Sequence, residues 1–524
     1  MKKIFKFIAA SCLMASVLAS CTGQFEDFNK SPYDPTPEQM GDALQGQYLQ
    51  NMQQALVQGQ QNNSQMIDHM VNSEYGGYIA CIAQWGNAGN FYTYNPRVGW
   101  VGYAFDTMMP QIFTPYVKIV EITKGQGPAH AWAQIMKVYG AYILNGIYGP
   151  IAYSKVDGEN ITVEYDSEEV LFDAMFADLN EGITTLTAAV LSGEDMSSLA
   201  NFDYVYGADF TKWVKFANTL KLRMAMRISN VEPELAQQMA EEAVNAPLGV
   251  LSAKGESAWS SFNDGMNPYY RAEVTWNGGE IRLSANVSSY LGGYGDPRLE
   301  VYAKPATYKV DDELIGIVGV RNGISQSSYS STVYQQFSCT NIGENDKLLI
   351  MSASEAYFLR AEGALKGWNM GGTAKELYEQ GVTVSMEERG VAIADYLSSE
   401  AVPADYVDAY SASRNATAVS AVTPKWVEGN ATANLEQILV QKWIASFPNG
   451  WERWGDFRRT GYPKMFPVVN NQNTDGVTTD RGMRRLPYSQ KEYNTNEANV
   501  KAAVETYLGG PDTGATDLWW AKKN

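Results

Sequence analysis

The segment from residue 353 to residue 390 constrains the fold most, because a short glycine-rich connection there joins two helical patterns. The apolar face of the first pattern consists of Ala353, Tyr357, Ala361 and Ala364. Small residues on that face allow a neighbouring helix to pack closely. Thr373 and Glu376 have the spacing of a capping box, and Gly390 ends the second pattern. The segment predicts a helix-turn-helix unit of the tetratricopeptide kind, although the strict repeat signature is absent.

Two earlier segments carry similar helical patterns with large apolar residues on one face. Pro128 to Tyr148 begins with a proline in the first turn and stops at Gly149 and Pro150. Asp209 to Ile228 repeats the pattern. Helical patterns dominate residues 38–245 and return over 346–465. We therefore predict a mainly α fold, in which tetratricopeptide-like helix pairs form a helical scaffold.

Residues 246–345 differ in composition from the scaffold. Gly, Ser, Asn and Tyr accumulate there, and the β-like runs Tyr308 to Val310 and Ile315 to Val320 appear. This pattern predicts a loop-rich excursion that carries short β segments. Loops held on a rigid scaffold are where binding residues concentrate. No Pro-rich or Ser/Gly-rich linker follows residue 40, so we predict one body over residues 38–524.

The N-terminus is typical of an exported lipoprotein. Lys2, Lys3 and Lys6 precede an apolar stretch that is too short to span a bilayer, which predicts a signal peptide over residues 1–20. Leu18-Ala19-Ser20-Cys21 has the order of a lipobox, so we expect Cys21 to carry a lipid. Two or three acyl chains on one cysteine make membrane attachment effectively permanent. The prolines within residues 21–37 predict an extended tether.

Charge and cysteine content exclude some functions. The formal net charge is −18, and removal of the three signal-peptide lysines makes it −21. A surface this acidic repels phosphate backbones, so we expect no nucleic-acid binding. Cys81 and Cys339 remain after export. We expect two buried free thiols, and a disulfide between them is the alternative.

The sequence carries no enzymatic signature that we recognise. His69 and His130 lack the spacing of a zinc site, and no nucleophile elbow, Walker loop or dinucleotide motif occurs. We therefore expect no enzyme and no cofactor, although paired carboxylates of a glycoside hydrolase cannot be read from sequence. Asn471, Asn473 and Asp475 imitate half of an EF-hand loop, but Gly482 stands at its twelfth position. A polar turn is the preferred interpretation, with a calcium site as the alternative.

Two regions offer aromatic faces and polar side chains suited to a sugar. The first lies within residues 75–103, and its candidate ligand residues are Trp85, Asn87, Asn90, Tyr92, Tyr94, Arg97 and Trp100. The second lies in the excursion, and its candidates are Trp276, Asn277, Tyr290 and Tyr294. We expect Trp85, Trp100 and Trp276 to stack on the ligand, and Asn87, Asn90 and Arg97 to hydrogen-bond it. The alternative for each aromatic side chain is that it fills the interior beneath a loop.

One charged and aromatic cluster has an architectural interpretation. Trp451, Trp454, Arg458 and Arg459 stand beside Glu452 and Asp456. In a helical scaffold such arginines more often form structural ion pairs than a sugar-stacking surface. We make the same assignment for Arg223 and Arg227.

Several segments in order resemble the SusD/RagB family, in particular its SusD-like branch. The segments that carry the resemblance are Phe28 to Pro32, Asn145 to Tyr153, Trp213 to Asn218, Leu222 to Arg227, Ser354 to Gly363, Trp451 to Pro463 and Arg484 to Tyr488. They cover the chain from the lipobox almost to its end.

The resemblance implies a surface-facing lipoprotein of the outer membrane with four tetratricopeptide-like helix pairs. It also implies a TonB-dependent outer-membrane transporter as partner, with a nutrient captured at their interface. The ligand residues of the family come from an early loop and a middle excursion, which agrees with the two aromatic regions. We expect an oligosaccharide or polysaccharide ligand and no catalysis. A peptide ligand, a surface glycoside hydrolase and a structural scaffold are the alternatives.

Overall fold

The computed structural model describes residues 42–83, 90–160, 162–261, 265–324 and 332–522. By its packing the chain divides into residues 1–47 and residues 48–524, and nearly all described residues belong to the second part. Helix α4 (Asp42–Met52) crosses this boundary. The predicted signal peptide and tether, with the lipid site at Cys21, lie outside the described residues. No helix in the described part of the chain is both long and apolar enough to cross a membrane.

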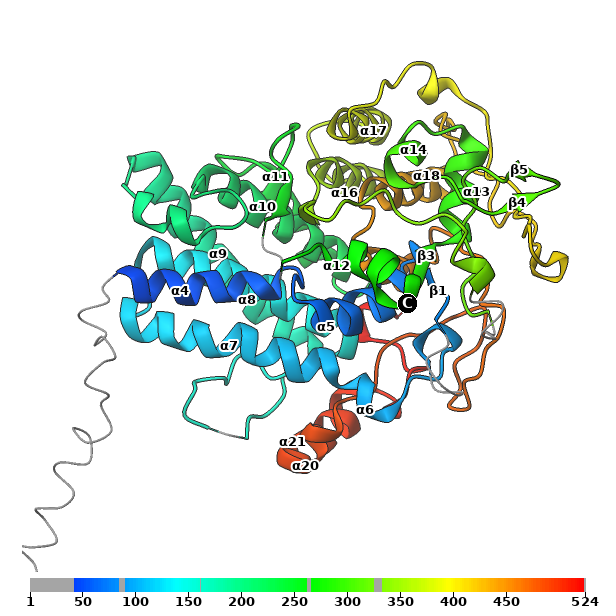
Figure 1. Cartoon of the computed structure of the whole chain (residues 1–524). Coiled ribbons are helices and arrows are strands. Elements are labelled where there is room, and N and C mark those ends of the chain that lie inside the picture. The colour runs from blue at the N-terminus through cyan, green and yellow to red at the C-terminus, as the bar shows by residue number, and fades with distance from the viewer. Residues whose placement is uncertain (1–41, 84–89, 161, 262–264, 325–331, 523–524) are drawn as a thin grey trace, which may run out of the picture. The chain divides into compact units, whose positions relative to one another are not determined.

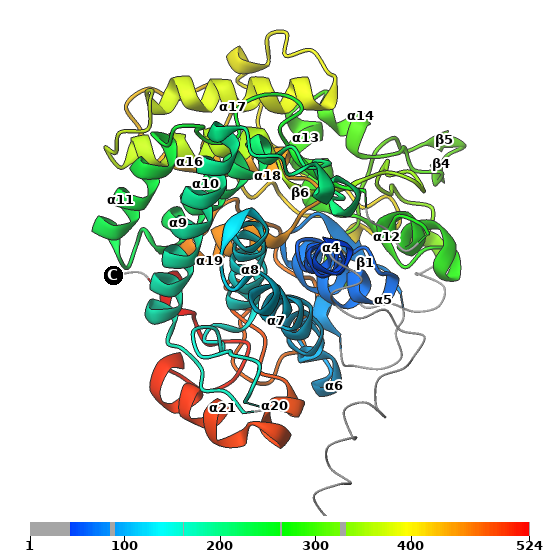
Figure 2. The same cartoon turned by 90° about the vertical axis from the view of Figure 1, so that its left-hand side faces the viewer.

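Five helices pack side by side in the first half of the second part (Figures 1 and 2). They are α7 (Tyr103–Thr123), α8 (Gly127–Tyr148), α9 (Glu168–Ser192), α10 (Phe210–Ile228) and α11 (Pro233–Val244). The Asp209 side chain caps α10 by accepting the backbone N–H of Lys212. Gly149, with φ 91°, ends α8. The predicted helices over 128–148 and 209–228 are confirmed.

A second group of helices consists of α16 (Ala353–Leu365), α17 (Ala374–Arg389) and α18 (Ala431–Ala445). The predicted capping box is present, because Thr373 and Glu376 each bond the other's backbone N–H. Gly390 ends α17 in the left-handed conformation, with φ 71°. A Cβ atom on Gly381 would lie 2.7 Å from the Phe358 ring, so α16 and α17 approach too closely for any larger residue. The helix pair predicted for 353–390 is confirmed, and so is the mainly α class.

Short strands lie in the excursion and in segments before and after it. The strands are β1 (Ile79–Cys81), β2 (Ala258–Ser260), β3 (Ile281–Leu283), β4 (Lys309–Val310), β5 (Glu313–Leu314) and β6 (Leu348–Met351). They form three two-stranded antiparallel sheets, β1 with β3, β2 with β6 and β4 with β5. The predicted run Ile315 to Val320 is not a strand, and only Val320 makes a bridge, to Ser284. The backbone groups that hydrogen-bond to this run belong to several different segments, so the run does not pair with one neighbouring strand.

The excursion also contains two helices that the sequence did not indicate, α13 (Ala285–Tyr294) and α14 (Arg298–Tyr302). Gly292 and Gly293 weaken the helical pattern of α13. A Cβ on Gly293 would lie 2.3 Å from the backbone of Ala404, so the helix needs glycine there. Other helices include α5 (Gln61–Asn63), the π-helix η2 (Ser64–Ser73), α6 (Val98–Val101), α12 (Pro268–Tyr270), α19 (Trp451–Thr460), α20 (Gln490–Thr495) and α21 (Glu497–Ala503).

A buried ion-pair network joins α10, α16, α18 and α19. Arg223 binds Glu355 through two hydrogen bonds of 2.7 Å, and neither side chain is more than 3 % exposed. The other pairs are Arg227 with Glu452 (2.9 Å), Lys442 with Asp456 (2.9 Å) and Arg459 with Glu362 (2.9 Å). Burial alone would raise the pKa of Glu452, but Arg227, Arg223 and Lys442 lower it to about 2. The structural role predicted for Arg223, Arg227 and Arg459 is confirmed.

Arg458 differs from this prediction, because no carboxylate in the described residues forms an ion pair with it. Its guanidinium lies 3.7 Å from the centre of the Trp454 ring and 4.8 Å from that of Trp520. Its Nε and Nη1 donate to the carbonyls of Trp454 and Arg484. Burial and the nearby Arg227 and Arg484 lower the pKa of Arg458 well below its usual value. Aromatic faces and carbonyl dipoles stabilise this charge in place of a carboxylate.

Candidate ligand-binding surface

The β1–β3 pair brings the two predicted ligand regions together. The strands run antiparallel with Ile79 opposite Leu283 and Cys81 opposite Ile281. The residues that follow β1 and those that precede β3 therefore lie at the same end of the pair. One further hydrogen bond of 2.8 Å, from the N–H of Ile82 to the carbonyl of Glu280, extends the pairing toward that end. Segments about two hundred residues apart thus meet at one place.

Helix α5 and the start of η2 connect these segments further. The Tyr103 hydroxyl donates to Asn63 Oδ1 at 2.9 Å, and the Gln65 amide donates to Glu280 Oε2 at 2.9 Å. Arg271 donates to the side chain of Gln61. We call the surface formed by residues 61–65, 97–103 and 271–280 the rim. Side-chain hydrogen bonds across the rim join the first aromatic region to the excursion.

Among the rim side chains that reach solvent are Arg97, Val98, Trp100, Trp276 and Asn277. The Val98 side chain is 70 % exposed, and the two tryptophans are half-buried against the core. The Arg97 guanidinium lies 4.6 Å from the centre of the Trp100 ring. That ring also stacks on buried Phe91, with ring centres 6.4 Å apart. Arg97 and Trp100 therefore offer one cation-aromatic unit rather than a bare stacking face.

The turn from Trp276 to Gly279 is held in one conformation. Asn277 lies in the left-handed region, with φ 48°, and its amide donates to Glu280 Oε1 at 2.6 Å. The Gln335 amide donates to the Asn277 carbonyl at 2.7 Å. Gly279 has φ 106°, and a Cβ there would lie 2.4 Å from the carbonyl oxygen of Glu273. The turn presents Trp276 and the exposed Asn277 side chain on a rigid base.

Several predicted ligand residues are buried instead. Tyr290 and Tyr294 are 1 % and 4 % exposed, so the prediction that they contact a ligand is wrong. They lie four residues apart on α13, where one face of the helix packs into the core against Trp443 and Tyr396. Their hydroxyls donate to the carbonyls of Lys464 and Val422. The sequence interpretation failed here because the helix was not recognised.

The residues from Asn90 to Tyr94 also lie largely inside. Asn90 and Tyr92 are 6 % and 5 % exposed, so they offer no open face, and their assignment to the ligand site is wrong. Tyr94 is half-buried, with φ 59°, and its ring centre lies 6.0 Å from that of Tyr75. Trp85 and Asn87 lie outside the described residues and stay predictions. Arg97, Trp100, Trp276 and Asn277 are the predicted residues that reach solvent on the rim.

Two buried carboxyl groups of this site, Glu74 and Glu273, have no cation in hydrogen-bond contact among the described residues. Glu74 accepts the backbone N–H of Cys81 at 3.0 Å and the Asn322 amide at 2.9 Å. Burial outweighs these two hydrogen bonds and raises the pKa of Glu74 to about 8. Glu273 accepts both the backbone N–H and the hydroxyl of Thr340, and burial raises its pKa to about 7. These carboxyls hold neighbouring segments of the site together while uncharged.

The groups considered for metal binding and disulfide formation play structural roles. Cys81 and Cys339 are not joined by a disulfide, and Cys339 is half-buried rather than fully buried. His69 is buried against the Tyr269 ring, with ring centres 4.5 Å apart. Asn471 Oδ1 accepts the N–H of Asn473, and Asn473 Oδ1 accepts those of Asp475 and Val477. Within the described ranges, no three His, Cys, Asp or Glu side chains cluster closely enough to hold a metal ion.

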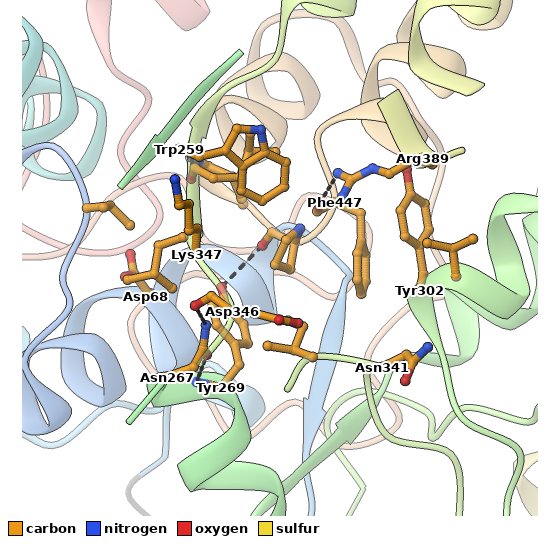
Figure 3. A pocket seen from close by; sticks show the side chains of 18 of the residues that line it. Asp68, Trp259, Asn267, Tyr269, Tyr302, Asn341, Asp346, Lys347, Arg389 and Phe447 are labelled. Atoms are coloured by element: carbon orange, nitrogen blue, oxygen red, sulfur yellow. Dashed lines mark hydrogen bonds between the residues drawn. The ribbon is translucent and has the colours of Figure 1, made fainter. Parts of the chain in front are cut away.

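The sequence interpretation missed a pocket of about 250 Å³ between β2, α12, α14, β6 and the end of α17 (Figure 3). Aromatic walls come from Trp259, Tyr269, Tyr302 and Phe447. Arg389, the last residue of α17, also lines the pocket. In the sequence, an arginine before Gly390 indicates only a favourable interaction with the helix C-terminus. Its place in a pocket depends on strands and loops more than 30 residues away.

Comparison with known proteins decides the family. The family described as "SusD-like: Susd and RagB outer membrane lipoprotein" matches residues 27–521. The chain belongs to the SusD-like family. No curated protein sequence matches it. The predicted family and its tetratricopeptide-type helical fold are confirmed.

Solved SusD-like structures superpose over most of the chain. A SusD-like protein from Bacteroides thetaiotaomicron is 40 % identical, with a TM-score of 0.86 over 92 % of this chain and 99 % of its own. A chitin-binding SusD homologue from Flavobacterium johnsoniae is 36 % identical, with the same TM-score and coverage. A SusD homologue from Bacteroides uniformis is 36 % identical, with a TM-score of 0.86 over 92 % of this chain and 100 % of its own.

Proposed function

We propose that this SusD-like chain binds a nutrient glycan at the bacterial cell surface and delivers it to a TonB-dependent outer-membrane transporter, without catalysis. The β1–β3 pairing carries this proposal, because it joins the two aromatic regions on the rim. The rim offers the indole of Trp276, the cation-aromatic unit of Arg97 and Trp100, and the polar side chain of Asn277. Aromatic faces match the C–H surfaces of sugars, and polar side chains match their hydroxyls.

The relatives support a glycan as the ligand. One SusD homologue of high structural similarity binds chitin, a polymer of N-acetylglucosamine. Chito-oligosaccharides are therefore the first probes to use, followed by oligosaccharides of other linkages. Trp85 and Asn87 belong to the proposed site on the strength of the sequence alone. The rigid turn around Asn277 supports a preformed ligand surface, which lowers the entropy cost of binding.

Calorimetry on alanine variants tests the site. Replacement of Trp85, Trp100 and Trp276 together should lower affinity for the bound oligosaccharide by at least about tenfold, since each stacked aromatic contributes about 0.5–1.5 kcal/mol. Trp368 is a matched control, because it is half-buried at the α16–α17 connection, away from the rim residues. Trp368→Ala should leave affinity unchanged. Equal affinity of the triple variant and the unaltered chain would refute the proposed site.

The anchoring and delivery steps need separate tests. Cys21→Ser should leave the chain without lipid and release it from the outer membrane, as fractionation would reveal, because the lipid is its proposed attachment. Co-purification of the lipidated chain with a TonB-dependent transporter would support delivery. Release of reducing ends from a bound polysaccharide by the purified chain would contradict the non-catalytic assignment.

A further inference from the structure

The pocket in Figure 3 is separate from the rim, because none of its lining residues belongs to residues 61–65, 97–103 or 271–280. In that view Asp68 and Lys347 lie on one side and Phe447, Tyr302 and Arg389 on the other. Asn341, Asp346 and Lys347 are exposed, so the pocket opens to solvent at the 341–347 loop. The deeper wall is apolar, with Val57, Leu348, Leu349 and Pro448.

Arg389 is held rigidly at this pocket. Its guanidinium lies 5.2 Å from the centre of the Trp259 ring and 4.8 Å from that of Tyr302. Tyr302 in turn stacks on Phe447, with ring centres 4.6 Å apart. Nη2 of Arg389 donates to the carbonyl of Phe447 at 2.8 Å. The guanidinium is therefore oriented before any ligand arrives, which favours binding.

The positive charge of Arg389 has no carboxylate partner within ion-pair distance among the described residues. The neighbouring Glu388 interacts electrostatically with Arg389, but it forms no ion pair with it. The Glu388 oxygens accept the hydroxyls of Ser257 and Ser354 and the N–H of Ala353. A guanidinium has five N–H donors, and in Arg389 only Nη2 makes hydrogen bonds to the part of the chain that the structure describes. A partly buried cation in this state attracts an anion.

The acidic residues that line the pocket do not pair with the charge of Arg389. Asp346 accepts the N–H of Gly343 at 2.8 Å and closes its own loop. Asp68 is 4 % exposed, and burial raises its pKa well above the usual value. Its Oδ1 has no hydrogen-bond partner in the described part of the chain. Burial thus favours the protonated form of Asp68, which can hydrogen-bond a ligand and carries no charge to repel an anion.

We propose that this pocket binds a small molecule with a carboxylate attached to an apolar side chain or to a ring that presents a C–H face, the carboxylate on Arg389 and the apolar part or face against Phe447 and Leu349. Ligand pockets commonly measure about 300–1,000 Å³, so a slightly smaller pocket fits a single building block. Two sources share this chemistry, the hydrophobic C-terminal residue of a peptide and a hexuronate. The site is independent of the glycan proposed for the rim.

Titration calorimetry on the full chain tests the proposal with two acids and their uncharged amides. The acids are N-acetyl-L-phenylalanine and methyl glucuronide, which represent the two sources. At least one acid should bind, and its amide should bind at least about tenfold more weakly, because a charge-assisted hydrogen bond contributes about 1.5–3 kcal/mol. The acid that binds identifies the source. Absence of binding by both acids at millimolar concentration, or equal binding of acid and amide, would overturn the proposal.

Variants locate the binding to this pocket. Arg389→Met should lose at least about tenfold in affinity, and Arg389→Lys should fall between the two because it keeps the charge without the planar fork. Arg360 is a matched control, since it lies 5.3 Å from the Tyr357 ring centre, donates to the Met370 carbonyl and lies outside the pocket. Arg360→Met and Trp276→Ala should leave acid binding unchanged. Unaltered binding by a folded Arg389→Met variant would overturn the assignment.

Discussion

Beneath the rim, buried carboxyls meet neutral donors, whereas between α10, α16, α18 and α19 they meet cations. Glu74 and Glu273 accept amide, hydroxyl and backbone N–H groups, and burial raises the pKa of both. Glu362 and Glu452 pair with arginines, and their pKa values are lowered despite burial. The scaffold therefore keeps one charge state over the physiological pH range, while the base of the rim gains charge near neutral pH.

The scaffold and the rim therefore use buried carboxyls in different ways. Helices that hold distant segments in place are joined by paired charges, and these are costly to break one partner at a time. The rim is formed by short helical segments and turns, and the buried carboxyls near it are held by neutral donors, so their charge changes near neutral pH. Four experiments test this difference between the scaffold and the rim.

Arg223→Met should have the largest effect on stability. It leaves Glu355 buried without its two hydrogen bonds from Arg223, and removal of one partner from a buried pair costs about 3–5 kcal/mol. Urea denaturation followed by circular dichroism would measure the loss. Lys375→Met, which breaks an exposed pair with Glu428, is the control and should change the free energy of unfolding little. Similar losses in both variants would remove the distinction between scaffold and surface pairs.

Glu74→Gln should flatten the pH dependence of stability. Above its usual pKa of 4.5, Glu74 loses its proton in the unfolded chain but keeps it in the folded chain up to about pH 8. The folded state then binds more protons, so the free energy of unfolding falls as pH rises from about 5 to 8. Each pKa difference of one corresponds to about 1.4 kcal/mol. Melting curves across this pH range should slope less in Glu74→Gln than in the exposed control Glu344→Gln, and equal slopes would contradict the assignment.

Tyr290→Phe and Tyr294→Phe should each lower stability by about 1 kcal/mol, because each removes a buried hydrogen bond to a backbone carbonyl. Neither change should alter affinity for the rim ligand, since both rings lie in the core. Urea denaturation and calorimetry on the same samples would measure the two quantities. A loss of glycan affinity in either variant would show that the α13 tyrosines contribute to ligand binding.

Chelation should have the smallest effect. The side-chain oxygens of Asn471 and Asn473 already accept backbone N–H groups within their own turn. We therefore expect excess EDTA to leave the melting temperature unchanged. A clear fall in melting temperature that calcium alone reverses would establish the calcium alternative and place a charged anchor near Tyr94.

Sequence patterns predicted the helices better than the contacts between them. Thr373, Glu376 and Gly390 carry local capping chemistry, so α17 could be placed almost to the residue. The burial of Tyr290 could not be foreseen, because Gly292 and Gly293 obscure the helix that carries it. The structural role of Arg223 was predicted, but its partner Glu355 lies 132 residues away and no spacing rule identifies it. The same limit concealed Arg389, whose pocket is assembled from segments far apart in the sequence.

The β1–β3 pair also determines when the rim can form during folding. Asn322, which bonds Glu74, lies 248 residues later in the chain, and Trp443, whose carbonyl accepts the Tyr78 hydroxyl, lies 365 residues later. Contacts so distant in sequence form slowly, since the entropy of closing a long loop is lost before the contact stabilises anything. The helix pair over 353–390 needs only neighbouring residues and can form early. The rim can therefore form only after most of the chain is present. A truncated chain can keep its local helices but lacks the ligand surface.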